Sequence, residues 1–334
     1  MSVRIGVVGA GNIGTAHAQN IAHLIAGATV SMVFDADRAR AAELADSVSA
    51  GVAASFEELI ASGYVDAIII ASPDDLHPSQ ALACLAAGKP TMCEKPLAPV
   101  VSDALAVMEA EVALGHRLIQ MGFMRRFDPG YLALKEQLRS KFIGVPLMIS
   151  CAHRNATVGP QHTTEMSLTN SAVHEMDITR WLLEDEIVAI TVLRGAVSPR
   201  AAAGLSDPLL ILMESSSGIL THLEHFSNCS FGYDVTCSVT GSEGVAELGN
   251  ASYVTTKRIG RAGVGLPAIW TDRFNDAYVA ELQAFVDGVA TGSLPGPSLW
   301  DGYVASACTT AGVESLRTGA RAEVTLVPRP ALYA

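Results

Sequence analysis

The sequence predicts an α/β protein with an N-terminal Rossmann domain, built on a doubly wound parallel sheet, and a C-terminal α+β domain. Three observations predict this fold: a glycine-rich turn behind the first apolar run, alternating strand and helix patterns over the first 120 residues, and successive hairpin signals later. The expected domains are 1–122 and 123–334. The chain has 334 residues, 49% hydrophobic and 17% charged, which suffices for two cores.

The glycine-rich turn is Gly9-Ala10-Gly11-Asn12-Ile13-Gly14, directly after the apolar run 3–8. Gly9 permits a tight turn, Gly11 lets the backbone approach a pyrophosphate, and Gly14 lets the next helix pack on the strand. The N-terminus of that helix presents unpaired N–H groups to phosphates. A plain tight turn is the alternative, but the order of strand, turn, helix, strand and acid favours a dinucleotide site.

Asp35 ends the second strand, 28–34, and bears on the choice of cofactor. Its carboxylate can accept hydrogen bonds from a ribose 2′-hydroxyl and would repel a 2′-phosphate, which favours NAD over NADP. Arg38 lies three residues further on and could instead meet a phosphate, so the preference is not absolute.

The remaining elements of the first part alternate regularly, which predicts a parallel sheet with helices on both faces. Strands are expected at 66–71, 91–93 and 118–121, with a short one near 51–53, and helices at 13–26, 36–47, 56–61, 77–87 and 101–114.

The second part has a different pattern, because several β runs follow one another and predict a large open, mostly antiparallel sheet. Strands are expected at 146–152, 188–194, 209–214, 218–226, 234–240 and 244–248, hairpin turns at 215–218 and 241–244, and helices at 130–140, 171–183, 273–290 and 299–318. Such a sheet leaves a face and edges exposed, so we expect this face to pack against another subunit in a homo-oligomer. A monomer with a hydrophilic outer face is the alternative.

The composition excludes several classes of partner. The net charge of −12 argues against a nucleic-acid partner and against an anionic membrane surface. No signal-peptide pattern and no apolar run of membrane-spanning length occur. The six cysteines are scattered without a C-x-x-C pair, so we expect them to be reduced and mostly buried in a cytoplasmic protein.

Glu94-Lys95-Pro96 follows the strand 91–93, at the strand end where open α/β sheets bind their ligands. A partly desolvated lysine there could have a lowered pKa and transfer a proton, or hold a developing alkoxide. A surface turn with a solvated lysine explains the same residues equally well.

Asn170, His174 and Asp177 lie at positions i, i+4 and i+7 of one expected helix and would share a face. This polar stripe could line a pocket or face water, and Asn170 or Ser171 could be the helix N-cap. His153, at the end of a strand, could line the same pocket.

No metal site is expected. His222 and Glu224 share one side of a strand with His225 opposite, and no pattern gathers three ligands. No G-x-S-x-G elbow or cysteine–histidine nucleophile pattern occurs either.

The motifs together resemble the glucose–fructose oxidoreductase, inositol dehydrogenase and rhizopine catabolism family. The resemblance covers essentially the whole chain and is carried by 9–14, Ser72-Pro73-Asp74-Asp75-Leu76-His77, Glu94-Lys95-Pro96 and His174-Glu175-Met176-Asp177. It is sharpest toward the inositol 2-dehydrogenases in 124–128, 151–155, 231–234 and 300–303.

The resemblance implies an NAD-dependent oxidoreductase, usually a tetramer, in which Lys95 and His174 are catalytic and Asn170 assists them. Expected cofactor contacts are Gly9, Gly11, Asn12, Ile13, Gly14, Asp35, Arg38, Ser72, Pro73, His77, Glu94 and Lys95. Expected substrate contacts are His153, Asn170, Asp177 and Tyr233, with Arg125 nearby. The implied reaction oxidises myo-inositol to 2-keto-myo-inositol (scyllo-inosose).

One position departs from the family pattern. Several inositol dehydrogenases carry an aspartate where this chain has Asn170, and an amide brings no charge to stabilise a protonated His174. Another cyclitol, an anhydrosugar or a hexose therefore stays open as the substrate. A non-catalytic NAD-binding regulator is a further alternative, disfavoured because Lys95 and His174 are both present.

Overall fold

The computed structural model describes residues 2–249 and 254–334 and divides into two compact units. The first unit comprises the chain up to Met124 with Asp276–Ser306 and Val327–Ala334, and the second comprises Arg125–Asn275 and Ala307–Leu326. The first division lies two residues from the expected one at 122/123. The C-terminal part differs from the expected continuous domain, because helices α9 (Trp270–Thr291) and α10 (Leu299–Thr318) each run from one unit into the other.

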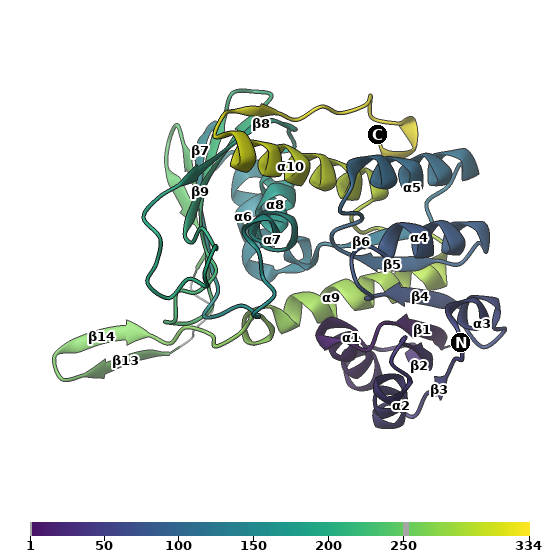
Figure 1. Cartoon of the computed structure of the whole chain (residues 1–334). Helices are drawn as coiled ribbons and strands as arrows, with labels where there is room; N and C mark the ends of the chain where they lie inside the picture. Colours follow the sequence, from purple (N-terminus) through teal and green to yellow (C-terminus); the bar gives the residue numbers. More distant parts are fainter. Residues whose placement is uncertain (1, 250–253) are drawn as a thin grey trace. The chain divides into compact units, whose positions relative to one another are not determined.

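The first unit is built on a parallel sheet that, in the described part of the chain, has six strands in the order β3-β2-β1-β4-β5-β6 (Figure 1). The strands are β1 (Val3–Val8), β2 (Ala28–Phe34), β3 (Gly51–Val52), β4 (Ala67–Ile70), β5 (Thr91–Glu94) and β6 (Ile119–Gly122). The strand order reverses between β1 and β4, and ligands of doubly wound sheets bind at such a reversal, beyond the strands' carboxyl ends.

The helices between these strands are α1 (Asn12–His23), α2 (Arg38–Ser47), α3 (Phe56–Ala61), α4 (His77–Ala86) and α5 (Val101–Leu114). α2 begins later than expected because the Asp37 carboxylate accepts hydrogen bonds from the N–H groups of Ala39 and Arg40 and caps the helix. Apolar side chains of α9, including Leu282 and Phe285, join the core formed by β1 and β2. This burial explains why a C-terminal segment belongs to the first unit.

The second unit has a larger sheet with the order β12-β11-β7-β10-β9-β8-β15 in the described residues. Its strands are β7 (Pro146–Arg154), β8 (Ile187–Arg194), β9 (Leu209–Ser215), β10 (Leu220–Phe226), β11 (Asp234–Gly241), β12 (Val245–Glu247) and β15 (Ala322–Glu323). Only the pairing of β7 with β10 is parallel within this sheet, so the predicted fold class is confirmed. β9 and β10 alternate buried and more exposed side chains, as expected for a sheet with one covered face.

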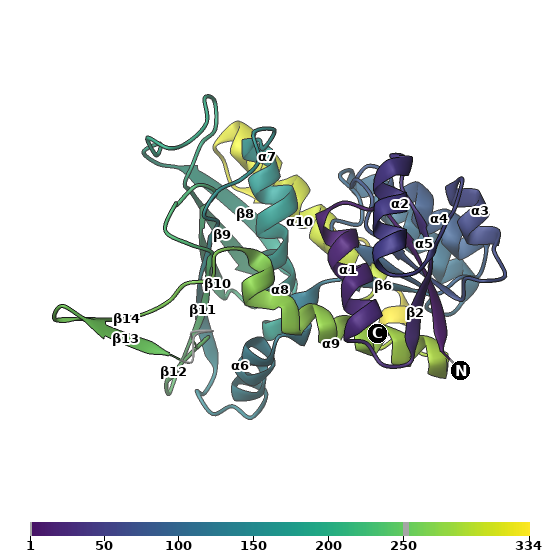
Figure 2. The same cartoon turned by 90° about the horizontal axis from the view of Figure 1, so that it is seen from below.

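Helices α6 (Pro129–Arg139) and α8 (Val173–Leu183) lie on one side of this sheet, as Figures 1 and 2 show. A short helix, α7 (Thr164–Met166), continues through the π-helical segment η2 (Ser167–Ala172) into α8. The predicted N-cap at Asn170 or Ser171 is therefore wrong. Both residues lie within a continuous helical run, and the first cap with a side-chain hydrogen bond is Thr163.

Residues 255–264, for which the sequence predicts no element, form a hairpin of β13 (Thr255–Arg258) and β14 (Arg261–Val264). Its strands are almost entirely exposed and show no buried alternation, which is the signal that strand prediction requires. Two 3₁₀ segments, η1 (Met124–Phe127) and η3 (Ala331–Tyr333), complete the described elements. Among residues 2–249 and 254–334, no helix has both the length and the apolar character that crossing a membrane requires.

Candidate active site

The glycine-rich turn joins β1 to α1 with the geometry that its sequence predicts. Gly9 has a φ of 98°, and a Cβ there would lie 2.4 Å from the Ala71 carbonyl oxygen. A Cβ on Gly14 would lie 1.9 Å from the Gly9 oxygen, whereas a Cβ on Gly11 would meet nothing within 4 Å. Gly9 and Gly14 thus serve close backbone packing, while Gly11 leaves open space beside the N-terminus of α1. Asn12, Ile13 and Gly14 form the first turn of α1, where no side chain caps the helix, so this turn fits a pyrophosphate.

The Asp35 carboxylate lies beside this turn, with one oxygen accepting from the Ala10 N–H at 2.7 Å and the other from the Asp37 N–H at 2.8 Å. The carboxylate is therefore held at the end of β2, where a ribose hydroxyl would be bound. Arg38 is the exposed first residue of α2, and the guanidinium of Arg40 lies 3.6 Å from the Asp35 carboxylate. The structure thus places Arg40 beside the acid.

His77 links the two loops that follow β4 and β5. Its Nδ1 lies 2.8 Å from the Pro96 carbonyl oxygen and its Nε2 lies 2.9 Å from the Ser72 carbonyl oxygen, and the side chain is buried. The Ser72 hydroxyl donates to Gln80, and Pro73 is exposed. His77 is therefore placed to hold the loops that carry Ser72 and Lys95.

Lys95 follows β5 and precedes Pro96 in a cis peptide bond. The adjacent Glu94 carboxylate accepts from the Lys95 N–H at 3.2 Å and lies 2.7 Å from Nε2 of His17, a buried residue of α1. Burial opposes ionisation of Glu94, but His17 and Lys95 together lower its pKa. Glu94 thus connects the lysine loop to the helix of the glycine turn.

The second unit holds a buried polar cluster around Glu175, the second residue after the start of α8. The Glu175 carboxylate accepts from Nη1 of Arg125, and its other oxygen lies 3.0 Å from Nδ1 of His153. Arg125 and Glu175 are each 1% exposed. Burial opposes ionisation of Glu175, but Arg125 and His153 outweigh it and lower its pKa to about 2.

Three rings surround His153. Its centroid lies 6.4 Å from that of His174, 5.4 Å from that of His225 and 5.8 Å from that of Tyr233. Burial and the neighbouring His153 lower the pKa of His225 to about 3, and neither of its ring nitrogens has a hydrogen-bond partner among the described residues. Burial raises the pKa of Tyr233 to about 12, which keeps its hydroxyl a donor.

Asp177 lies two residues after Glu175 in α8, and its side chain is 1% exposed. Both of its carboxylate oxygens face the Arg126 guanidinium, whose Nε donates at 2.9 Å. Asn170 is partly exposed and lies in the π-helical segment η2, which precedes the helix that carries His174.

The structure places Arg125, His153, His174 and Tyr233 together within the second unit. Lys95 and the expected cofactor contacts lie within the first unit. His17, Glu175 and His225 also belong to these polar groups, although no sequence pattern marks them as site residues. His225 and His153 are neighbours through the parallel register of β10 and β7, which no local pattern reveals.

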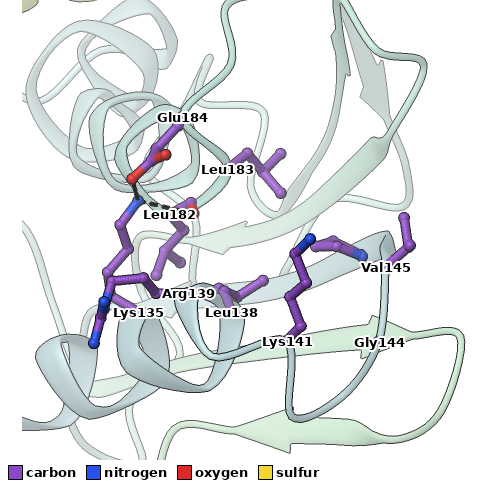
Figure 3. Close-up of a pocket in the computed structure, with 10 residues that line it drawn as sticks. Lys135, Leu138, Arg139, Lys141, Gly144, Val145, Leu182, Leu183 and Glu184 are labelled. Carbon is purple, nitrogen blue, oxygen red and sulfur yellow. Dashed lines mark hydrogen bonds and ion pairs between the residues drawn. The ribbon is translucent and has the colours of Figure 1, made fainter.

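A pocket of about 350 Å³ lies elsewhere in the second unit and is a poor candidate for this chemistry (Figure 3). The Lys135 ammonium points to Glu184, 2.7 Å away, and donates to the carbonyl oxygens of Trp181 and Leu182 at the end of α8. Arg139 pairs with Glu136. These cations are already engaged, and the lysine caps the helix.

In the described ranges, no group of three or more His, Cys, Asp or Glu side chains is arranged to hold a metal ion. The cysteines, all within those ranges, are buried and free, as the sequence predicted.

Comparisons with known proteins cover the whole molecule. Residues 3–123 match the description "Oxidoreductase family, NAD-binding Rossmann fold", and residues 135–326 match "Oxidoreductase family, C-terminal alpha/beta domain". The chain is 44% identical over 337 residues to inositol 2-dehydrogenase 1 of Saccharopolyspora erythraea, covering 100% of this chain and 99% of that protein. It is 43% identical over 335 residues to inositol 2-dehydrogenase of Klebsiella pneumoniae, with the same coverage.

Solved structures agree with this assignment. The crystal structure of myo-inositol dehydrogenase from Lactobacillus casei, in complex with NAD(H) and myo-inositol, matches with a TM-score of 0.97 at 31% identity and covers 100% of both chains. A myo-inositol dehydrogenase from Corynebacterium glutamicum matches with a TM-score of 0.88 at 26% identity, covering 98% of this chain and 100% of that one. The resemblance seen in the motifs is confirmed: the chain belongs to the oxidoreductase family of glucose–fructose oxidoreductase, inositol dehydrogenase and the rhizopine catabolism protein.

Proposed function

We propose that this protein is an NAD-dependent dehydrogenase that oxidises a secondary ring hydroxyl of a cyclitol, with myo-inositol as substrate and 2-keto-myo-inositol (scyllo-inosose) as product. The observation that carries the proposal is the full-length match to the Lactobacillus casei enzyme, whose structure contains NAD(H) and myo-inositol. The open space at Gly11 and the placement of Asp35 support NAD as the cofactor.

In the proposed reaction, His174 is the general base that takes the proton of the reacting hydroxyl. Lys95 donates a hydrogen bond to the same oxygen and stabilises the negative charge that develops there. Asn170 orients His174 or a neighbouring substrate hydroxyl through its amide. NAD held at the glycine turn and Asp35 would supply the acceptor for the hydride on the carbinol carbon.

Recognition of a polyol requires several hydrogen-bonding groups in a desolvated site, because an unmet polar group there penalises a wrong substrate. We assign this role to His153, Asp177 and Tyr233. Arg125 is fully buried against Glu175 and His153, which favours a supporting role for it.

The cofactor side of the proposal assigns phosphate binding to Gly9, Gly11, Asn12, Ile13 and Gly14, and ribose binding to Asp35. Arg38 is placed near the ribose, and Ser72, Pro73, His77, Glu94 and Lys95 in the loops that face the nicotinamide half. Comparing kcat/KM with NAD and NADP tests the role of Asp35, since its carboxylate repels a 2′-phosphate.

A substrate panel tests the reaction: inositol isomers, anhydrosugars and hexoses are each supplied with NAD, and NADH is measured by absorbance. We expect the highest kcat/KM with myo-inositol. Turnover confined to another sugar would favour a sister dehydrogenase, which the amide at Asn170 keeps as the second candidate. NAD binding without turnover of any polyol would contradict an enzymatic role and favour a regulator.

We further propose a cytoplasmic homotetramer assembled through the outer face of the second unit's sheet. This face carries exposed apolar side chains on adjacent strands, among them Met148, Leu210 and Leu220. Exposed apolar surface of this kind marks subunit contacts. Analytical ultracentrifugation tests it, and Leu210→Glu with Leu220→Glu is expected to dissociate the assembly.

A further inference from the structure

The buried cluster of the second unit contains a carboxylate that the proposed reaction does not use. Glu175 sits between two partners, with one oxygen bound by Arg125 Nη1 and the other 3.0 Å from His153 Nδ1. All three side chains are at least nine-tenths buried, so water does not compete for these contacts.

The contacts of His153 Nδ1 determine which nitrogen carries the proton. Glu175 only accepts hydrogen bonds and lies at 3.0 Å, whereas Nη2 of Arg125 only donates and lies at 3.3 Å. The two neighbours require opposite states of Nδ1. The shorter contact, to an ionised carboxylate, is the stronger hydrogen bond, so Nδ1 donates to Glu175.

The buried cluster already holds one cation and one anion beside the ring of His153. Arg125 already compensates the charge of Glu175, and a protonated His153 would add a second buried cation without a second anion. Burial lowers the pKa of the neighbouring His225 to about 3, so that ring adds no charge to the cluster. A neutral His153 with its proton on Nδ1 has a lone pair on Nε2, and no hydrogen bond among the described residues uses that atom.

We propose that Glu175 is a positioning residue that fixes the tautomer of His153, so that Nε2 accepts a hydrogen bond from one substrate hydroxyl. The inference rests on the proposed polyol substrate and extends it to specificity. The subsite at His153 requires a group that donates a proton. It discriminates against a fluorine, a ketone or an ether at that ring position, because Nε2 would then face another acceptor.

The substitution Glu175→Gln tests this role with little change of shape. Arg125 only donates, so the amide oxygen turns to it and the NH₂ group faces Nδ1 of His153. Nδ1 then becomes the acceptor and the proton moves to Nε2. With myo-inositol we expect a rise of about tenfold or more in KM and a smaller change in kcat, because uniform binding is lost.

The selective readout uses deoxyfluoro-inositols in which one hydroxyl at a time is replaced. The wild type is expected to discriminate strongly against one of these analogues, and Glu175→Gln to reduce that preference at least tenfold for the same analogue. Glu186→Gln is the matched control. Glu186 also pairs with an arginine of α8: its carboxylate accepts from Arg180 Nη2 at 2.9 Å. Unchanged selectivity in Glu175→Gln would overturn the proposal.

A second measurement uses the wild-type protein and does not depend on the folding of Glu175→Gln. The ¹⁵N NMR spectrum of wild-type protein labelled on histidine reports which ring nitrogens are protonated, and His153→Gln identifies the signal. We expect His153 with a protonated Nδ1 and an unprotonated Nε2, and a proton on Nε2 would overturn the proposal. Failure to turn over any polyol would instead contradict the proposed function, and the spectrum would still report the tautomer.

Discussion

The glycine turn of the first unit and the Glu175 cluster of the second are built from different chemical groups. At the turn, the polar groups are backbone N–H groups. Gly9, Gly11 and Gly14 have no side chain that would fill the space beside them. In the cluster, the polar groups are side chains from α8, β7, β10 and the chain before α6. Hydrogen bonds join Glu175 to Arg125 and His153, and His225 adds a ring contact with His153. The first of these two regions therefore depends on local sequence, and the second on contacts between distant parts of the chain.

The largest effect is expected from Lys95→Met, which removes the amine that we propose acts on the reacting oxygen and leaves the glycine turn unchanged. The kcat should fall about 10²–10⁴-fold, because general acid–base and electrostatic help at the reacting oxygen is lost. The Kd for NAD, measured by calorimetry, should change little. A variant with near-normal kcat would show that the lysine takes no part.

The second effect compares two carboxylates with similar pKa values, one in each unit. Arg4 lowers the pKa of Asp66 to about 2 at the surface, and Arg125 with His153 outweighs burial to lower that of Glu175 to about 2. Glu175→Gln should cost about 3–5 kcal/mol of unfolding free energy, since it leaves a buried Arg125 uncompensated. Asp66→Asn should cost less than about 1 kcal/mol, because its pair is exposed and screened.

These carboxyl groups also predict the pH dependence of stability. Both pKa values are lowered in the folded state, so the stabilisation is present above the ordinary carboxyl range and is lost as the pH falls toward 2. Urea unfolding between pH 6 and pH 2 should show a shallower acid loss in each variant. High salt should weaken only the contribution of Asp66. Equal salt sensitivity at the two sites would contradict the burial of Glu175.

The third effect separates the glycines of the turn from one another. Gly11→Ala should leave the thermal midpoint unchanged, because its Cβ meets nothing within 4 Å, yet weaken NAD binding about tenfold by filling the space beside the phosphates. Gly14→Ala should lower both the thermal midpoint and the affinity for NAD, since its Cβ would lie 1.9 Å from the Gly9 oxygen. Calorimetry and thermal unfolding distinguish these outcomes. NAD binding unaffected by Gly11→Ala would place the pyrophosphate elsewhere.

The smallest expected effect is a shift in pH dependence. Asn170→Asp adds a carboxylate that stabilises a protonated His174 and so raises its pKa. The base must be unprotonated to act, so the acid limb of kcat/KM should move to higher pH. Asn170→Ser, which adds no charge, is the control. An unchanged profile in Asn170→Asp would show that this position does not interact with the histidine.

The sequence predicted the first unit well because its signals are local. The turn at Gly9, the acid at Asp35 and the strand ends near Lys95 follow from short patterns, and the strand bounds agree within one or two residues. The site of the second unit was predicted only in part. Helical spacing and the family resemblance point to His174 and Asp177 as candidates. Asn170, expected on the same α-helix, lies in a π-helical segment.

The remaining residues could not be predicted because they depend on long-range pairing. His225 is adjacent to His153 only through the parallel register of two strands about 70 residues apart in the chain. Glu175 is a single acidic residue between His174 and Met176, and this local sequence does not predict a buried ion pair. Its role appears only when Arg125, 50 residues earlier, is placed against it.

The discontinuous first unit has a consequence for how the chain is synthesised. The Tyr333 hydroxyl donates to Glu111, which also holds the N–H groups of Leu118 and Ile119 at the start of β6, and Leu282 and Phe285 complete the core beneath β1. The strands of the first unit therefore leave the ribosome long before the C-terminal residues that complete its core have been translated. A nascent chain halted after residue 275 should expose apolar surface and attract chaperones.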